Sequence, residues 1–590
     1  MRKRVRMEPT EKERGDMETL GMRDIIGPIM IGPSSSHTAG ALRIAHMARG
    51  LMAAAPVRVH FTLYGSFAHT GSGHGTDKAL VAGMLGLAAD DLAIRDSFAL
   101  AASNGLAVSF SRDLDTSTEH PNTVDLHIVD AEGGTLELRG VSTGGGAAAI
   151  RSIDGVDVNI TGAHTSIVVR QDDVKGVLAH IAGCLSDYDV NIATTRMYRT
   201  RRGDTAYTVM EVDGRVPGGA ATVIAQHPGV HSVRIIPSDA SGNFDLAEGP
   251  DNRRSNDQGQ RGSTSAASGA TEGDVAEVNA VEENTAGSAS PDADQAFDRV
   301  DFTSGKELLA RCKELRCSLG EAFLARERAL GARDGQPTPL DTYCTHVIAV
   351  MREAVNGPLD HPTPSMGGLI GGEARMLADT RRQSTAIVDD LTADAMEYAL
   401  AALETNASMG RIVAAPTAGS SGVLPGVLFS LEKRHGFDDA TLKHGLFAAG
   451  AVGYLIARNA TVSGAEGGCQ AEIGAAAAMA AAAAVEMAGG TPEQALDAAG
   501  NALTSLLGLV CDPVGGLVEV PCQKRNATAA ATALVSAQIA LAGVSNLVNF
   551  DETVSAMDAV GRSLPFELRE SALGGIAATP SACAWCAARS

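Results

Sequence analysis

GAEGGCQAEIGAAAAMAAAAA at residues 464–484 and LLGLVCDPVGGLVEVPCQKRN at residues 506–526 decide the fold of the C-terminal half of this chain. The alanine run predicts a helix whose small side chains let other helices approach closely. Three cysteines, Cys469, Cys511 and Cys522, stand near Gly or Pro, which shape turns that can hold a thiolate in place. Three converging thiolates would leave one iron of a four-iron cluster open, and an open iron is a Lewis acid.

The same cysteines admit a second interpretation. Free cysteine is among the most buried residue types, so three cysteines in an Ala-rich chain can simply fill the core. Their spacing is also not that of a zinc ribbon or a ferredoxin, whose ligands come in tight CxxC groups. The spacing alone leaves both interpretations open.

Length and composition limit the classes of protein to consider. At 590 residues the chain is too long for one core, and its 44% hydrophobic and 20% charged residues are ordinary for a soluble globular protein. A formal net charge of -22 argues against nucleic acid or an anionic membrane as a partner. The basic N terminus leads into no apolar run, so neither a signal peptide nor an anchor is predicted. We therefore expect a cytoplasmic protein with reduced thiols, no disulfides and small-molecule ligands.

Residues 22–155 are predicted to form an α/β or α+β domain, preceded by a flexible N terminus at residues 1–21. Strand-like segments at 57–64 and 123–129 alternate with helix-like segments at 39–54 and 78–87. Two motifs stand at the junctions between these segments.

The first motif is GPSSSHTAG at residues 32–40, directly ahead of a predicted helix. Ser and Thr cap helix N termini, and the exposed N–H groups there attract an anion such as a carboxylate. Capping alone needs one hydroxyl, whereas four surround His37 in this motif: Ser34, Ser35, Ser36 and Thr38.

The second motif is LYGSFAHTGSGHGTDKAL at residues 63–80, a strand that runs through a Gly-rich loop into a helix. His74 stands between two glycines, which suits a side chain exposed to a ligand more than one that fills a core. A lone histidine is more often structural, and the sequence favours neither role.

Residues 165–237 predict a βαββαβ unit, the order of the ferredoxin-like sandwich. Through Asp173, Gly176 and the Asn191-Ile192 pair the unit resembles the ACT domain, a family of small-molecule sensors. Lys175 stands where members of that family usually carry Pro. Binding of an amino-acid effector and a purely structural, dimer-forming role both stay open.

Residues 238–300 lack periodicity and are rich in Ser, Gly, Asn, Asp and Glu, which predicts a disordered acidic linker. From residue 301 to residue 590 the pattern predicts an all-α domain. Its uncharged stretch at 527–550 is expected to be a buried helix, apolar on all sides, and not a membrane span. A loop rich in Gly and hydroxyls, APTAGSSGVLPG at 415–426, suits binding of a carboxylate by backbone N–H groups.

Taken together, the chain resembles the iron–sulfur-dependent L-serine dehydratases, also called L-serine ammonia-lyases. The resemblance is carried by GPSSSHTAG, YGSFAHTGSGHGTDKAL, APTAGSSGVLPG, SGAEGGCQAEIG and GLVCDPVGGLVEVPCQKRN. Some relatives carry a β part, which ends in an ACT domain, and an α part on separate subunits. The resemblance therefore implies that both parts are fused here through the acidic linker.

The resemblance also implies the chemistry. A [4Fe-4S] cluster on Cys469, Cys511 and Cys522 would polarise the β-hydroxyl of L-serine without pyridoxal phosphate, and a base would remove the α-proton, giving pyruvate and ammonia. His74 is the expected base, with His37 as the alternative. The residues expected to hold the substrate are Ser34, Ser35, Ser36, Thr38, Thr417, Ala418, Gly419, Ser420, Ser421 and Gly422.

Two other functions stay open. A related hydro-lyase would act on L-threonine or another β-hydroxy acid, since one methyl is worth only roughly 1–3 kcal/mol of discrimination. An amino-acid or redox sensor would suit the ACT-like unit and a cluster, although the sequence shows no helix-turn-helix or basic face. We also expect a homodimer and leave a monovalent-cation requirement open.

The remaining cysteines are assigned by context. In some family members the chain end enters the active site and a terminal cysteine caps the fourth iron. This chain ends in Ala-Ala-Arg-Ser, so capping by Cys583 or Cys586 is only a hypothesis. Structural roles are expected for Cys184, Cys312, Cys317 and Cys344, with Cys312 and Cys317 on one charged helix.

Overall fold

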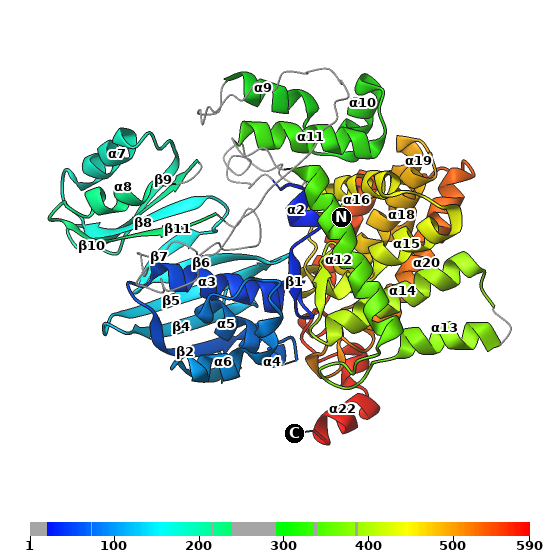
Figure 1. Ribbon diagram of the computed structural model, residues 1–590, viewed down its shortest axis with the longest axis horizontal. Helices are drawn as coiled ribbons and strands as arrows, with labels where there is room; N and C mark the ends of the chain where they lie inside the picture. The colour runs from blue at the N-terminus through cyan, green and yellow to red at the C-terminus, as the bar shows by residue number, and fades with distance from the viewer. Residues whose placement is uncertain are drawn as a thin grey trace, which may run out of the picture.

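The chain folds into an N-terminal α/β region, a small α/β unit and a helical C-terminal region, which Figure 1 shows next to one another. The expected multidomain organisation is confirmed. The computed structural model describes residues 20–71, 73–213, 216–238, 291–334, 339–383 and 387–589. Residues 1–19 of the predicted N terminus and 239–290 of the predicted linker lie outside the described residues.

A six-stranded sheet forms the centre of the N-terminal region. Its strands are β2 (Pro56–Tyr64), β3 (Ala107–Asp113), β4 (Thr123–Asp130), β5 (Thr135–Gly144), β6 (Ala147–Ile153) and β7 (Val156–Ile160). The order is β3-β2-β4-β5-β6-β7, with β2 and β3 parallel and the other pairs antiparallel. The helices that lie along it in Figure 1 are α3 (Gly40–Leu51), α5 (Thr76–Leu85) and α6 (Ser97–Ser103). Alternate residues of β4 are buried with these helices, as a one-sided core requires.

The predicted strands at 57–64 and 123–129 correspond to β2 and β4, and the predicted helices correspond to α3 and α5. The predicted boundary at residue 155 falls inside the sheet. Strand β7 continues the sheet to Ile160, because Val156, Val158 and Ile160 are buried in its core.

Residues 165–237 form the small unit. Its elements are β8 (Thr165–Asp172), α7 (Val177–Asp187), β9 (Ile192–Arg199), β10 (Thr205–Val212), α8 (Gly218–Ile224) and β11 (Val230–Ile236). The strand order is β11-β8-β10-β9, and all three pairs are antiparallel. This is a ferredoxin-like sheet with its own apolar core under α7 and α8.

The end of the predicted linker is ordered, which corrects the expectation of disorder up to residue 300. Residues 291–300 form helix α9, Pro291–Val300. Its Phe297 is 4% exposed and lies under the guanidinium groups of Arg326 and Arg333, 5.5 Å and 4.3 Å from its ring centroid. One aromatic side chain with two cation–π contacts therefore docks a segment whose average composition predicts disorder.

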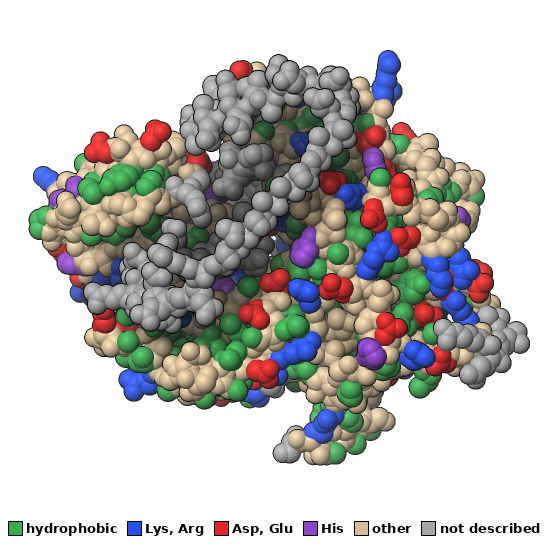
Figure 2. Space-filling view, in the orientation of Figure 1, with side chains coloured by type: hydrophobic (Ala, Val, Ile, Leu, Met, Phe, Trp, Pro, Cys, Tyr) green, Lys and Arg blue, Asp and Glu red, His purple; other side chains and the backbone are tan. Residues whose placement is uncertain are grey.

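The helical region follows. Its longer helices are α10 (Gly305–Leu315), α11 (Leu319–Arg333), α12 (Leu340–Asp360), α13 (Glu373–Gln383), α14 (Asp390–Ala407), α15 (Val423–His435), α16 (Asp439–Asn459), α18 (Ala475–Met487), α19 (Pro492–Ser505), α20 (Cys522–Leu541), α21 (Phe550–Ser563) and α22 (Pro580–Ala587). Figure 2 shows acidic and basic side chains interspersed on the visible face of this region, and α22 projects from its edge.

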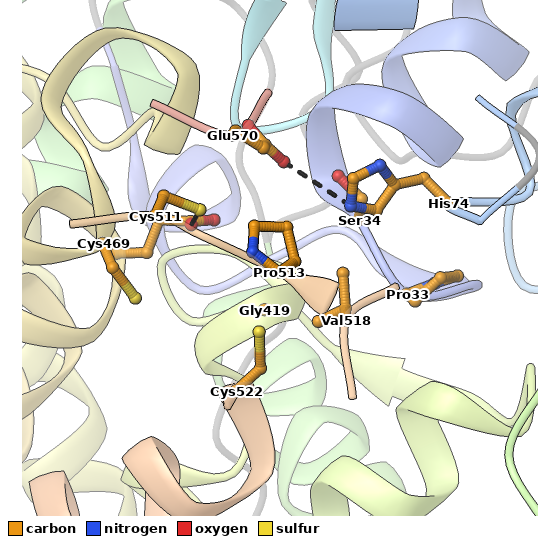
Figure 3. Close-up of a pocket in the computed structure, with 11 residues that line it drawn as sticks. Pro33, Ser34, His74, Gly419, Cys469, Cys511, Pro513, Val518, Cys522 and Glu570 are labelled. Atoms are coloured by element: carbon orange, nitrogen blue, oxygen red, sulfur yellow. Dashed lines mark hydrogen bonds and ion pairs between the residues drawn. The ribbon is translucent and has the colours of Figure 1, made fainter. Parts of the chain in front are cut away.

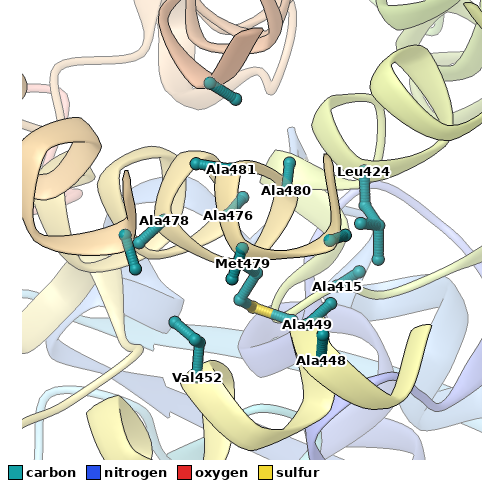
Figure 4. Packing of buried hydrophobic residues seen from close by; sticks show 14 of the residues in the cluster. Ala415, Leu424, Ala448, Ala449, Val452, Ala476, Ala478, Met479, Ala480 and Ala481 are labelled. Carbon is teal, nitrogen blue, oxygen red and sulfur yellow. The ribbon is translucent and has the colours of Figure 1, made fainter. Parts of the chain in front are cut away.

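Helix α18 is the centre of the helical region, as the alanine run predicts. All of its residues except Glu486 are buried. It packs against α15, α16, α19 and α20, and Figure 4 shows Met479 pointing toward Ala448 and Ala449 of α16, with Ala480 and Ala481 on the opposite side of the helix. Alanine suits this central helix because it has the highest helix propensity and its small side chain lets neighbouring helices approach closely.

The expectation for residues 527–550 is wrong. Helix α20 ends at Leu541, a loop follows, and α21 begins at Phe550. Val535 and Ile539 of α20 are 56% and 38% exposed, so this helix has one buried face only. Among the described residues, the helix with the length and hydropathy to cross a membrane is α16, and most of it is buried inside the helical region.

The N-terminal chain segment joins the two regions. Helix α2, Met22–Ile25, packs into the core of the helical region, where Gly453 leaves room for Ile25. Strand β1 (Ile29–Ile31) then pairs antiparallel with β12 (Arg411–Val413). Leu20, assigned to the flexible N terminus, is ordered as well, and its carbonyl accepts a hydrogen bond from Arg326. The motif at 32–40 is thereby placed against loops of the helical region.

Candidate active site

One cavity lies where loops of the N-terminal region meet loops of the helical region (Figure 3). It encloses about 350 Å³, part of which is open to solvent. Its lining residues are Pro33, Ser34, His74, Gly419, Cys469, Glu472, Cys511, Pro513, Val518, Cys522 and Glu570. Segments far apart in the sequence therefore build a single site.

The three predicted ligand cysteines all line this cavity and are buried. Cys469 follows Gly468, whose φ of 74° needs glycine, and lies between α17 (Gly464–Gly467) and η4 (Gln470–Gly474). Cys511 forms an isolated β-bridge with Arg569, and Cys522 is the first residue of α20. Figure 3 shows their sulfur atoms around one space, as the turn positions predict.

These thiols fit an iron–sulfur cluster. All nine cysteines lie among the described residues, and each of them is free. A hydrogen bond with Cys469 and burial raise the pKa of Cys511 well above its usual value, and burial does the same for Cys522. Because the thiolate is the ligating form, a metal cation would stabilise it against this burial. Three buried, convergent thiols without a disulfide are a soft donor set suited to iron.

His74 and His37 lie side by side and face Glu570. Their ring centroids are 4.4 Å apart, and Glu570 Oε1 lies 3.5 Å from His37 Nδ1 and 3.9 Å from His74 Nε2. The other ring nitrogen of His37, Nε2, lies 2.9 Å from Ser66 Oγ. Neither ring nitrogen of His74 has a hydrogen-bond partner among the described residues. His74 is therefore the histidine whose nitrogens are left for a ligand.

The two histidines are neutral near pH 7, and Glu570 holds its proton more tightly than an ordinary carboxyl group does. Burial lowers the pKa of His74 to about 3 and, together with the nearby His74, lowers that of His37 well below its usual value. Burial and the neighbouring Glu472 raise the pKa of Glu570 well above its usual value. A neutral imidazole can accept a proton, which is what a general base must do.

His74 is fully buried within the fold, and its side chain lines the cavity, where a ligand could reach it. The glycines let this loop pack tightly. A Cβ at Gly73 would lie 2.5 Å from the carbonyl oxygen of Gly516, so only glycine allows this approach to the helical region. This close approach places the next residue, His74, beside the helical region, where it lines the cavity.

The hydroxyls of the first motif have divided roles. Ser34 lines the cavity and caps the π-helical turn η1, Ser35–Ala39, by accepting a hydrogen bond from His37 N. The others hold neighbouring parts of the site: Ser35 Oγ accepts from Ala418 N at 2.8 Å, Ser36 Oγ lies 3.1 Å from His37 Nδ1, and Thr38 Oγ1 donates to the His74 carbonyl at 2.7 Å.

The residues of the second predicted loop, Thr417 to Gly422, also differ in their roles. Gly419 lines the cavity. The other groups bond within the protein: Thr417 Oγ1 donates to Glu472 at 2.9 Å, Ser420 Oγ donates to the Ala415 carbonyl at 3.2 Å, and Gly422 N donates to Asn526 Oδ1 at 3.0 Å. Ser421 Oγ is buried without a hydrogen-bond partner among the described residues.

Sequence reasoning missed two buried carboxyl groups of the site. Glu472 follows Cys469 by three positions, so helical spacing could have placed it on the same face. Burial raises its pKa to about 7. Glu570 follows the short turn η6, Phe566–Leu568, in a segment without a motif, so only the tertiary structure reveals it.

The tail cysteines are not among the residues that line the cavity. Cys583 is exposed on α22, and Cys586 lies near Gly515. Cys312 and Cys317 do not share a helix, which corrects that expectation. Arg316, with φ of 53°, ends α10, and Cys317 follows it in the turn before α11.

Comparison with known proteins agrees with this geometry. Residues 262–577 match the family model of the serine dehydratase alpha chain, and residues 24–151 match that of the beta chain. The probable L-serine dehydratase alpha chain of Bacillus subtilis is 44% identical over 280 residues, covering 48% of this chain and 92% of that protein. The probable beta chain of the same organism is 39% identical over 220 residues, covering 37% of this chain and 99% of that protein.

A single-chain relative spans nearly the whole molecule. The L-serine dehydratase of Streptomyces coelicolor is 30% identical over 562 residues, which is 93% of this chain and 96% of that protein. The fusion expected from the sequence is thereby confirmed. The chain belongs to the L-serine dehydratase family and carries the beta-chain and alpha-chain regions of that family in one polypeptide.

Proposed function

We propose that this protein is an L-serine ammonia-lyase, which converts L-serine to pyruvate and ammonia. The observation that carries the proposal is the cavity itself. Within the region matched by both family models, it sets three convergent thiols opposite a neutral, unpartnered histidine. That arrangement supplies the two functions that elimination of water requires, a base and an acid for the leaving hydroxyl.

Cys469, Cys511 and Cys522 would hold a [4Fe-4S] cluster. When bound, such a cluster supplies a Lewis acid at the iron that has no protein ligand, and the reaction needs no pyridoxal phosphate. Glu472 lies next to these thiols, with one carboxyl oxygen 3.9 Å from Cys511 Sγ and the other held by Thr417. Glu472 thus links the thiol of Cys511 to the Thr417 loop.

The chain's own residues handle the proton. His74 Nε2 accepts the α-proton of L-serine, because burial keeps its imidazole neutral and neither ring nitrogen makes a hydrogen bond among the described residues. Glu570 and His37 flank it and fix the direction of the ring. His37, with protein groups at both ring nitrogens, is the second candidate for the base.

The substrate's carboxylate and ammonium are assigned to Ser34 and the Gly419 loop. Ser34 Oγ and the backbone of Gly419 are the parts of the two predicted loops that line the cavity. The remaining predicted residues, Ser35, Ser36, Thr38, Thr417, Ala418, Ser420, Ser421 and Gly422, support them. Loss of the α-proton and the β-hydroxyl gives an aminoacrylate, which tautomerises and hydrolyses to pyruvate and ammonia.

Other aspects extend the proposal. The unit at 165–237 has a ferredoxin-like strand order, which is compatible with an ACT domain, and we assign to it the binding of an amino-acid effector. The test is whether single amino acids shift the melting temperature of the protein.

We further propose a cytoplasmic homodimer, whose activity is to be assayed with and without monovalent cations. An L-threonine lyase and a cluster-based sensor are the competing functions.

An anaerobic experiment tests the proposed function. The protein is purified with iron and sulfide present, its iron content is measured, and pyruvate formed from L-serine is assayed before and after exposure to air. About four irons per chain and activity lost in air are expected. A protein without iron that forms no pyruvate, or forms it only with pyridoxal phosphate, would refute the assignment.

A further inference from the structure

The cavity has an apolar wall. Its other side chains are thiols, carboxyl groups, an imidazole and a hydroxyl, whereas Pro33, Pro513 and Val518 are aliphatic. Figure 3 shows Val518 between Pro513 and Pro33. A methyl group of a ligand is favourably placed in contact with these aliphatic side chains. In contact with the buried polar side chains, it would deprive those polar groups of water without giving them a hydrogen-bond partner.

Val518 cannot move out of the cavity. It packs in a small buried cluster with Leu403 and with Cys522, which also lines the cavity. Val is β-branched, so one rotamer dominates once one side of the residue is packed. The side chain is therefore a rigid part of the wall.

The loop that carries Val518 is braced as well. The carboxylate of Glu519 accepts hydrogen bonds from Gly367 N at 2.6 Å and Leu369 N at 3.0 Å. Val514 N donates to the Val520 carbonyl at 2.9 Å. The backbone on both sides of Val518 is thus held, and it cannot yield to a larger ligand.

We propose that Val518 determines the preference for L-serine over L-threonine. This inference rests on the proposed function, since it concerns which β-hydroxy amino acid the same cavity admits. The two substrates differ by one methyl on Cβ, and with the polar groups of the substrate on polar partners, that methyl must meet the apolar wall. Pro33 precedes η1 and Pro513 precedes η5 (Val514–Gly516), and the ring of each is tied to its own backbone, so the branched side chain of Val518 sets the width available to the methyl.

Substitutions of Val518 test the proposal through the ratio of the kcat/KM for L-threonine to the kcat/KM for L-serine. Val518→Ala is expected to raise the kcat/KM for L-threonine relative to that for L-serine by about tenfold or more, and Val518→Ile is expected to lower it. Val514→Ala is the matched control. It removes the same groups from a buried valine of the same loop that does not line the cavity, and its ratio should equal that of the unmodified protein.

A second readout does not depend on turnover. L-alanine and L-2-aminobutyrate lack the hydroxyl and differ by the same Cβ methyl. Ligands that bind the folded protein raise its melting temperature. L-2-aminobutyrate should stabilise Val518→Ala more than it stabilises the unmodified protein, whereas L-alanine should stabilise both equally.

The outcomes separate this inference from the proposed function. If the unmodified protein forms no pyruvate from L-serine, the proposed function fails, and the binding comparison still decides the role of Val518. If L-serine is turned over but neither the threonine ratio nor the aminobutyrate shift changes in Val518→Ala, the role of Val518 is refuted. If Val518→Ala does not fold, an unchanged ratio in Val518→Ile refutes it equally.

Discussion

The two walls of the cavity come from regions of different construction. The N-terminal wall, Pro33, Ser34 and His74, stands on loops around a mixed sheet, and it brings the proposed base. The opposite wall stands on the Ala-rich helical region and brings the thiols. Neither region alone therefore has a complete site. Substitutions in the thiol wall should affect iron binding, whereas substitutions in the N-terminal wall should affect kcat and leave iron binding unchanged.

The largest effect is expected at the thiol wall. Replacing Cys469, Cys511 or Cys522 by Ala should abolish both iron binding and pyruvate formation, because each removes one of three ligands. Iron content and activity are measured on the same anaerobic preparation. Cys344→Ala removes a fully buried thiol in α12 and should keep its iron. Full iron content in any of the three ligand variants would contradict the assignment.

The proton-handling wall should behave differently. His74→Gln is expected to lower kcat by about 10²- to 10⁴-fold, the usual contribution of a general base, while the iron content stays unchanged. His60→Gln, at a half-buried histidine of β2 that does not line the cavity, is the control and should leave kcat unchanged. If His37→Gln rather than His74→Gln produced the loss, the roles of the two histidines would be exchanged.

The two regions should also differ in acid stability. Among the described residues, the buried histidines, His37, His46 and His74, all lie in the N-terminal region. Burial lowers the pKa of His46 to about 4, so the unfolded chain binds the proton more readily. The free energy of unfolding therefore falls as pH drops from about 6.5 to about 4, by roughly 3 kcal/mol for this residue.

Hydrogen exchange checks this difference. Between pH 7 and pH 5, amides of α3 should lose protection more than amides of α18. His46→Gln should flatten the dependence, since the substituted side chain does not titrate. Equal loss of protection in both helices would show that the buried histidines do not govern acid stability.

A smaller effect is expected where the walls are joined. Asn406 Nδ2 donates to the Pro33 carbonyl at 3.2 Å and to the Ala418 carbonyl at 2.8 Å, so it links a loop of each region. Asn406→Ala removes both bonds and leaves the Pro33 carbonyl without its partner, while the Ala418 carbonyl keeps its hydrogen bond from Ser421 N at 3.1 Å. The loss should cost about 1–3 kcal/mol of stability. Denaturant unfolding measures it. Asn459→Ala, an exposed residue with two similar bonds, should cost less.

The smallest effect is expected in the tail. Cys583 is exposed on α22 and is not among the residues that line the cavity, so Cys583→Ala should leave iron content and activity unchanged. A shift of the cluster's absorption spectrum in this variant would instead support capping by the tail.

Local patterns were enough for much of the fold. The alternation in residues 123–129 gave strand β4, and the alanine run gave the buried helix α18, because both signals lie within one element. Predictions from local sequence patterns failed where a single tertiary contact matters more than the average composition of the segment. Phe297 orders α9 against two arginines. Exposed Val535 and Ile539 show that an uncharged stretch of a helix need not be buried all round.

The sequence by itself determined the candidate chemical groups of this protein: three cysteines on turns, one histidine among hydroxyls, one histidine between glycines, and two loops rich in hydroxyls. Only the tertiary structure decided their roles. Whether a hydroxyl faces the cavity, as Ser34 does, or holds a neighbouring loop, as Ser35 does, depends on contacts between chain segments far apart in sequence. Glu570 enters the site for the same reason, since packing between the two regions, and no local pattern, brings its carboxyl group to His37 and His74.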